Sequence, residues 1–138
     1  MSWTLVCFAV RAWFAFAYYE LVLCRWGFGE IHRRLTRSRF EASYSREMTP
    51  VICKAVNLAT CFYFKPVHCL QQSVVTVDML RESRIPASLV IACRPSPYLA
   101  HAYVEVDRKI VNDSPAYAKR LTVLYRNDPQ ERRKQPCQ

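Results

Sequence analysis

Residues 69–93 have the sequence CLQQSVVTVDMLRESRIPASLVIAC, and this stretch contains the change of pattern that decides the fold. In its first part, residues 69–84, apolar side chains recur every three to four positions, a spacing that places them on one face of a helix. Ile85 and Pro86 end that pattern. Residues 87–93 then form a short, continuous apolar run that is typical of a buried strand. The chain is therefore expected to change from helix to strand at this proline.

Further strand signals follow toward the C-terminus. Residues 94–97 (RPSP) indicate a turn, and residues 100–106 (AHAYVEV) alternate between the two faces of a strand. A tight connection leads to a short strand at residues 110–111, and residues 121–125 supply a last strand. Short strands separated by such short connections favour antiparallel pairing.

Helices are expected to occupy the N-terminal half. Residues 3–24 are strongly apolar and aromatic and predict one long helix, which Gly27 and Gly29 interrupt. A basic amphipathic segment follows at residues 30–39, and a second helix is predicted for residues 48–63. The fold class is thus α+β, with N-terminal helices followed by a small antiparallel sheet.

Composition excludes several classes of function. The chain has only two glycines, close together in the sequence, so no glycine-rich phosphate-binding loop can be written. The seven cysteines include no CxxC pair, which excludes zinc ribbons and thioredoxin-type motifs, and we expect neither a metal nor a cofactor. No cleavable signal sequence is visible, so we expect reduced thiols and a cytoplasmic location.

The charge distribution bears on possible partners. The formal net charge is +9, and the excess gathers in residues 25–46 and 120–134. It accompanies no zinc finger or RNA-binding motif, so nucleic acid is not the expected partner. Arg11 and Glu20 interrupt the apolar N-terminal segment, whose longest uncharged run is far shorter than the ~20 residues of a spanning helix. We expect this helix to be buried or to dock a partner, without membrane contact; association with a membrane surface is the alternative.

Cys69, His101 and Asp113 form a candidate catalytic set. Cys69 is predicted at a helix N-terminus, where backbone N–H groups favour the thiolate. His101 lies near the start of the alternating strand and Asp113 twelve residues later, so a hairpin can place the carboxylate beside the imidazole. Each residue also has an ordinary structural explanation: a core cysteine, a structural histidine, and a polar turn at residues 112–115.

From Cys69 to Asp113 the chain resembles the transglutaminase-like cysteine peptidases that remove the leader in lasso-peptide biosynthesis. The intervals of 32 residues from cysteine to histidine and 12 from histidine to aspartate suit that family. Strong resemblance covers about a third of the chain. It is carried by Cys69-Leu70-x-x-Ser73, Leu80-Arg81-x-x-x-Ile85-Pro86-Ala87, Ala100-His101-Ala102-Tyr103-Val104-Glu105 and Val111-Asn112-Asp113.

The resemblance implies a papain-like catalytic core and a role for each residue of the set. Cys69 would be the nucleophile, His101 the general base and acid, and Asp113 the residue that orients His101. The reaction would be removal of the N-terminal leader from a ribosomally made precursor through an acyl-enzyme on Cys69. The oxyanion hole would use the Cys69 backbone N–H, with Tyr63 or Gln71 as candidates for the second donor.

Two positions depart from the family pattern, and two further histidines need an assignment. Gln72 and Tyr103 stand where the family commonly has Arg and Trp, which affects substrate fit and removes no reacting atom. His68 directly precedes the cysteine, and because adjacent side chains on a helix do not face each other, we assign it a structural or substrate-facing role. His32 lies among arginines and is assigned to a solvated basic face.

The length of 138 residues predicts one domain over residues 1–138. Within it we expect helical support in residues 1–65, the catalytic core in residues 66–126 and a polar tail in residues 127–138. Some relatives in the family carry an extra winged-helix domain that recognises the leader, and this length leaves no room for one. The expected partners are therefore the precursor leader, a separate leader-recognition protein and the ATP-dependent lasso cyclase.

Two alternative functions stay open. An amidase or acyltransferase could use the same scaffold, because an amine can resolve an acyl-enzyme as well as water can. A non-catalytic subunit could keep the fold and dock partners through the aromatic N-terminal helix.

Overall fold

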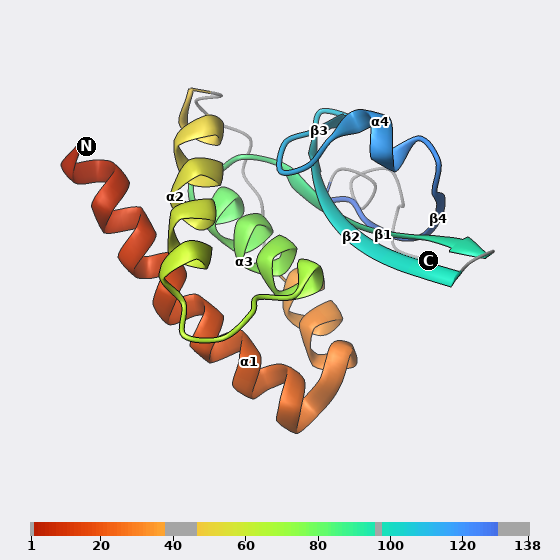
Figure 1. Cartoon of the computed structure of the whole chain (residues 1–138), viewed down its shortest axis with the longest axis horizontal. Coiled ribbons are helices and arrows are strands. Elements are labelled where there is room, and N and C mark those ends of the chain that lie inside the picture. Colours follow the sequence, from red (N-terminus) through yellow and green to blue (C-terminus); the bar gives the residue numbers. More distant parts are fainter. Residues whose placement is uncertain (1, 38–46, 96–97, 130–138) are drawn as a thin grey trace.

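The computed structural model describes residues 2–37, 47–95 and 98–129, and it confirms the α+β fold class (Figure 1). Three helices come first in the chain, and an antiparallel sheet follows them. The elements are α1 (Trp3–Arg37), α2 (Met48–Phe62), α3 (Cys69–Glu82), β1 (Ala87–Pro95), β2 (Tyr98–Val106), β3 (Lys109–Ile110), α4 (Pro115–Ala118) and β4 (Thr122–Asn127). The predicted polar tail and the end of the predicted basic segment lie largely outside the described residues.

The sheet has the strand order β3-β2-β1-β4, and each neighbouring pair is antiparallel. Figure 1 shows α3 between the sheet and the other two long helices, with α4 beside the strands. Both faces of the sheet are covered, so residues 102–106 of β2 are all buried and the expected alternation of exposed residues is absent there. Val104 packs into the helical core, whereas Tyr103 packs with Ala118 of α4. The sequence did not predict α4, because four residues are too few to show a helical period.

A kink divides α1 into two helical segments. Gly27 has φ +70° and ψ −169°, a backbone conformation that favours glycine. The interruption predicted at Gly27 is therefore confirmed, while Gly29 lies within the second segment. That segment turns toward the sheet (Figure 1) and brings Ile31 and Leu35 into the core.

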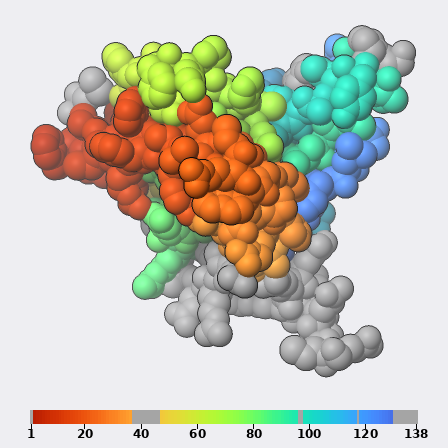
Figure 2. Space-filling view, turned by 90° about the horizontal axis from the view of Figure 1, so that it is seen from below, coloured from red at the N-terminus to blue at the C-terminus, as the bar shows by residue number. Residues whose placement is uncertain are grey.

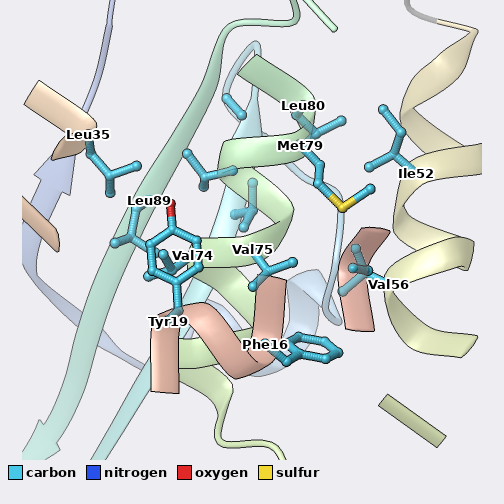
Figure 3. Close-up of a cluster of buried hydrophobic side chains, with 14 of the residues drawn as sticks. Phe16, Tyr19, Leu35, Ile52, Val56, Val74, Val75, Met79, Leu80 and Leu89 are labelled. Carbon is cyan, nitrogen blue, oxygen red and sulfur yellow. The ribbon is translucent and has the colours of Figure 1, made fainter. Parts of the chain in front are cut away.

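The main core gathers around α3, which contributes a continuous run of buried residues from Ser73 to Val77. A helix in contact on several sides buries more than one stripe, which explains why polar Gln71 is also covered. Fully burying one large apolar side chain contributes about 1.5–3 kcal/mol, so this cluster supplies much of the folding free energy. Figure 3 shows the labelled side chains Phe16, Tyr19, Leu35, Ile52, Val56, Val74, Val75, Met79, Leu80 and Leu89.

The first segment of α1 has a buried face and an exposed apolar face. Ala12, Phe16, Tyr19 and Val22 pack into the core. Figure 2 shows α1, in red to orange, spread across one face of the molecule. By length and composition alone α1 could cross a membrane, although core helices meet the same criterion. In its most apolar stretch of 18 residues, 28% are buried in the fold.

Arg81, at the end of α3, joins three other parts of the chain. Its guanidinium donates to the carbonyl oxygens of Leu35 at 2.6 Å, Ala87 at 3.0 Å and Asn127 at 3.2 Å, and to the Asn127 side chain at 2.8 Å. The Arg81 side chain is buried. If it were removed, these carbonyl groups would have no hydrogen-bond donor in a place that water reaches poorly.

We expect Arg81→Met to lower the free energy of unfolding by about 3 kcal/mol, because methionine keeps the volume but leaves buried acceptors unpaired. Urea denaturation followed by circular dichroism measures this change. The matched control is Arg120→Met, at an exposed arginine, which should change the free energy by less than about 0.5 kcal/mol. Equal effects of the two variants would contradict the structural role of Arg81.

The buried carboxyl of Asp78 makes the free energy of unfolding depend on pH. Burial raises the pKa of its carboxyl and Glu82 adds to the rise, while the Tyr19 hydroxyl, Arg81 and Arg11 act in the opposite direction. Above the ordinary carboxyl pKa of about 3.9 the unfolded chain loses this proton first, so the folded state binds more protons. The contribution of Asp78 to stability therefore falls as the pH rises through the raised pKa.

We expect Asp78→Asn to remove this dependence, because the amide oxygen can still accept from Tyr19 without carrying a charge. The free energy of unfolding of the variant, minus that of the wild type, should increase between about pH 4 and about pH 7. Denaturation curves at a series of pH values test the sign, and a difference independent of pH would refute it.

Candidate active site

Cys69 is the first residue of α3, as the sequence predicted. His68 precedes it in extended conformation, with φ −73° and ψ 152°, and its carbonyl oxygen accepts the first helical bond from Gln72 N–H at 3.0 Å. The Cys69 side chain is half-buried, and His68 is exposed. The thiol therefore lies at a helix N-terminus where a substrate can approach from the solvent side.

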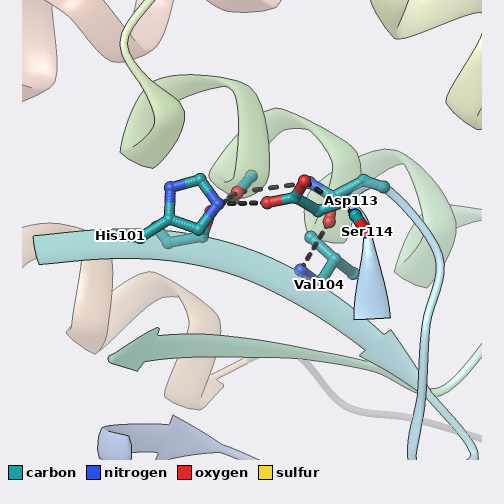
Figure 4. A network of polar contacts seen from close by, with 7 residues as sticks. His101, Val104, Asp113 and Ser114 are labelled. Carbon is teal, nitrogen blue, oxygen red and sulfur yellow. Dashed lines mark hydrogen bonds and ion pairs between the residues drawn. The ribbon is translucent and has the colours of Figure 1, made fainter. Parts of the chain in front are cut away.

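His101 and Asp113 lie in direct contact (Figure 4), which is the juxtaposition that the hairpin predicted. Asp113 Oδ2 contacts Nε2 of the imidazole, and Asp113 Oδ1 accepts the Ser114 backbone N–H at 2.7 Å. Both carboxylate oxygens are therefore engaged, which fixes the orientation of the group. The two side chains are 21% and 28% exposed, so a substrate and water can reach the pair.

This contact determines which imidazole nitrogen can act as a base. A carboxylate accepts hydrogen bonds, so it favours the tautomer in which Nε2 of His101 carries the proton. The basic nitrogen is then Nδ1, which Figure 4 shows on the side of the ring away from Asp113. The Tyr103 ring lies beside the imidazole, with centroids 6.3 Å apart at 30°, and its burial limits movement of that flank.

A hydrogen bond connects the helix of Cys69 with the strand of His101. Ser73 lies one turn after Cys69 on the same helix face, and its Oγ donates to the Ala102 carbonyl at 3.0 Å. Because Ala102 directly follows His101, this face of α3 meets the backbone of β2 one residue from His101. The structure thus brings His101 and Asp113 into contact and places the helix of Cys69 against the same strand, and the catalytic roles of all three residues stay predictions.

Sequence reasoning missed the part that Asn112 plays in this region. Its Oδ1 accepts the Val104 N–H at 2.8 Å, and its Nδ2 donates to Ser73 Oγ at 3.3 Å. The sequence of residues 112–115 predicts only a polar turn. The available signal was that Ser73 and Asn112 both belong to the segments that carry the family resemblance.

The two side chains suggested as the second oxyanion-hole donor have structural roles instead. Gln71 is buried and donates its amide N–H to the Phe16 carbonyl at 2.8 Å. Tyr63 donates its hydroxyl to Glu20 at 2.7 Å, and burial together with this bond raises the pKa of Tyr63 to about 12. Both groups hold α1 in place, so neither prediction for this donor is supported.

The positions that depart from the family pattern and the second histidine also have structural contacts. Gln72 donates to the Asn57 side chain at 2.7 Å and so links α3 with α2. Tyr103 is buried beside His101. His32 is exposed, as expected for a solvated face, but its ring contacts the Tyr125 hydroxyl on β4.

The other described cysteines differ from Cys69 in exposure or position. Cys53 is buried, which raises the pKa of its thiol to about 11. The apolar sequence around Cys61 predicts a position in the core, but this thiol is exposed on α2, as are those of Cys7 and Cys24 on α1. Among the residues that the structure describes, no group of three or more His, Cys, Asp or Glu side chains forms a metal site.

Comparison with known proteins finds a family whose model covers the candidate site. A family model described as "Transglutaminase-like superfamily" matches residues 15–126, which include the candidate site. Over 85 residues the chain is 34% identical to the Microcin J25-processing protein McjB of Escherichia coli, covering 59% of this chain and 40% of that protein. The chain therefore spans about two fifths of the length of this relative. No solved structure matches the chain.

Proposed function

The chain belongs to the transglutaminase-like superfamily, and from this premise we propose that it is a cysteine peptidase that removes the leader from a lasso-peptide precursor. The observation that carries the proposal is the His101–Asp113 contact, on a strand that the helix beginning with Cys69 meets at the next residue, Ala102. A similar protein is named for the processing of microcin J25, which supports processing of a ribosomal peptide as the role. We expect the reaction in the cytoplasm, where thiols stay reduced.

The proposed reaction proceeds through a thioester on Cys69. His101 Nδ1 accepts the thiol proton as Sγ attacks the scissile carbonyl, and Asp113 stabilises the imidazolium through Nε2. Collapse of the tetrahedral intermediate breaks the C–N bond, and His101 gives its proton to the amine of the departing core peptide. Water activated by His101 then hydrolyses the thioester, which frees the leader as a carboxylic acid and restores Cys69.

Mass spectrometry of a precursor incubated with this protein and the products of neighbouring genes tests the proposal. Peptide hydrolysis requires two products whose masses sum to the precursor plus one water. An acyltransferase would instead give the leader joined to an added amine. A precursor that stays intact under all combinations would favour the non-catalytic docking subunit.

We further propose that a separate leader-recognition protein docks on the apolar groove between α1 and α2. This groove has a volume of about 380 Å³ and is lined by Val6, Ala9, Val10, Trp13, Phe14, Leu58, Ala59 and Phe62. Phe14 and Phe62 are exposed, as are Trp3 and Tyr18 elsewhere on α1. The aromatic content of this helix predicts a partner-facing Phe16, but Phe16 is fully buried and cannot contact a partner.

If the recognition protein docks at this groove, single substitutions there should reduce the gain in cleavage rate that the protein provides. Adding the recognition protein should raise the apparent second-order rate of cleavage by about tenfold, through a higher local concentration of precursor. Phe14→Ala and Phe62→Ala should reduce this gain, because exposed aromatic anchors contribute most to such interfaces. Trp26→Ala removes an exposed aromatic residue of α1 outside the groove and should keep the gain. Equal losses in all three variants, or full activity without any partner, would contradict the proposal.

A further inference from the structure

We propose that Ser73 and Asn112 are positioning residues that set the distance between the Cys69 thiol and the His101–Asp113 pair. This inference rests on the proposed function, because the peptidase reaction is the one that such positioning would serve. Its geometric basis is a set of hydrogen bonds among the described residues. Neither residue touches the reacting atoms in the proposed mechanism, so their effect acts through Cys69, His101 and Asp113.

Three hydrogen bonds form one connected bridge from α3 to β2 and to the loop after β3. Ser73 Oγ donates to the Ala102 carbonyl at 3.0 Å and accepts from Asn112 Nδ2 at 3.3 Å. Asn112 Oδ1 in turn accepts the Val104 N–H at 2.8 Å. Ser73 and Asn112, which are 39 positions apart in the sequence, are thus directly hydrogen-bonded to each other.

The bridge occupies the edge of β2 where the pairing with β3 has ended. Within the described sheet, β3 pairs with β2 only at Glu105 and Val106. Toward the start of β2, the Val104 carbonyl still accepts the Val111 N–H at 3.0 Å. The Ala102 carbonyl and the Val104 N–H bond instead to the side chains of Ser73 and Asn112. Unpaired backbone groups at a buried edge are costly, so these contacts hold the helix and the loop at a defined register on β2.

Each end of the bridge controls one part of the candidate site. Ser73 follows Cys69 by four residues, about 6 Å along the helix axis, so a shift of Ser73 relative to β2 moves the thiol relative to His101. Asn112 directly precedes Asp113, so its anchoring fixes the backbone from which the carboxylate reaches Nε2. A misplacement of about 1 Å at a reacting group can cost about a hundredfold in rate.

The α3 helix offers a matched pair of substitutions for a test. Ser73 and Thr76 are both 1% exposed, and each donates its hydroxyl to a backbone carbonyl. Thr76 donates to Gln72 within its own helix at 2.8 Å, so Thr76→Val removes a buried hydroxyl without loosening contact with β2. Ser73→Ala removes the bond between the elements, and Ser73→Thr retains a hydroxyl at that position.

The first measurement is the rate of iodoacetamide alkylation of Cys69 at neutral pH, followed by peptide mapping, which needs no peptide substrate. An imidazole held close to the thiol favours the reactive thiolate. We expect Ser73→Ala to slow this reaction by about tenfold, Ser73→Thr to restore most of the rate, and Thr76→Val to stay within about twofold of the wild type. If Ser73→Ala does not fold, Asn112→Asp serves instead, because it keeps the acceptor for Val104 and loses the donor to Ser73.

The second measurement is precursor cleavage, where Ser73→Ala should lower kcat by about a hundredfold with KM within about twofold. Equal alkylation rates in Ser73→Ala and Thr76→Val would overturn the positioning role, even if the wild type cleaves the precursor. Slow alkylation of Ser73→Ala together with an intact precursor in the wild-type reaction would support positioning and refute the proposed peptidase. The two proposals can therefore fail separately.

Discussion

Cys69→Ala is expected to abolish cleavage of the precursor while leaving the fold intact. In the proposed mechanism the substitution removes the sulfur that forms the thioester, so the residual rate should fall to that of the reaction without protein. Cys69 is half-buried at the first position of α3, so loss of its sulfur should change the free energy of unfolding by less than about 1–2 kcal/mol. Mass spectrometry of the precursor and thermal unfolding of the variant measure the two effects.

Cys61→Ala is the matched control, because it removes an exposed thiol from α2. This variant should retain both activity and stability. Cleavage by Cys69→Ala at the wild-type rate would refute the assignment of the nucleophile. A loss of stability in proportion to the loss of activity would instead identify Cys69 as a structural residue.

Asp113→Asn should lower kcat/KM by about 10³–10⁴-fold without unfolding the protein. The carboxylate accepts at Nε2, whereas an amide can present its N–H₂ group there and favour the tautomer with the proton on Nδ1. The nitrogen that should accept the thiol proton would then already carry one. The amide also loses the charge that stabilises the imidazolium.

Steady-state kinetics with the precursor measure this loss, and circular dichroism verifies the fold. Asp107→Asn makes the same chemical change in the turn between β2 and β3, where φ is +52° and asparagine is well tolerated. It should leave kcat/KM unchanged. Near wild-type activity in Asp113→Asn would show that the carboxylate does not orient His101.

The parts of the fold and site that follow from local sequence signals were predicted well. The apolar period of residues 69–84 indicated a helix that begins at Cys69, and this start is confirmed. The hairpin after β2 is short, so the meeting of His101 and Asp113 depends on few residues and could be inferred from their spacing. Fold class could be inferred for the same reason, because the long helices show a helical period and the long strands show either alternation or a short apolar run.

The features that depend on contacts between distant segments could not be inferred. Nothing near Phe16 distinguishes it from Phe14, yet the first is fully buried and the second exposed, because α2 and α3 cover only one face of α1. The contact of Ser73 with Asn112 joins α3 to a loop after the sheet, and no local period encodes it. Cys61 was misplaced for a similar reason, since an apolar sequence around a residue does not define which face of a helix is covered.

The bend at Gly27 requires a left-handed backbone conformation, although there is ample room for a side chain. No neighbouring atom lies within 4 Å of the place where a Cβ would stand, so volume does not restrict this position. The φ of +70° is costly for L-amino acids and is the mirror image of a conformation that they readily adopt. A D-amino acid of almost any size would therefore suit the bend better than its L-enantiomer, and glycine is the genetically encoded residue closest to that requirement. Chirality, more than packing, selects the residue that turns the end of α1 back into the core.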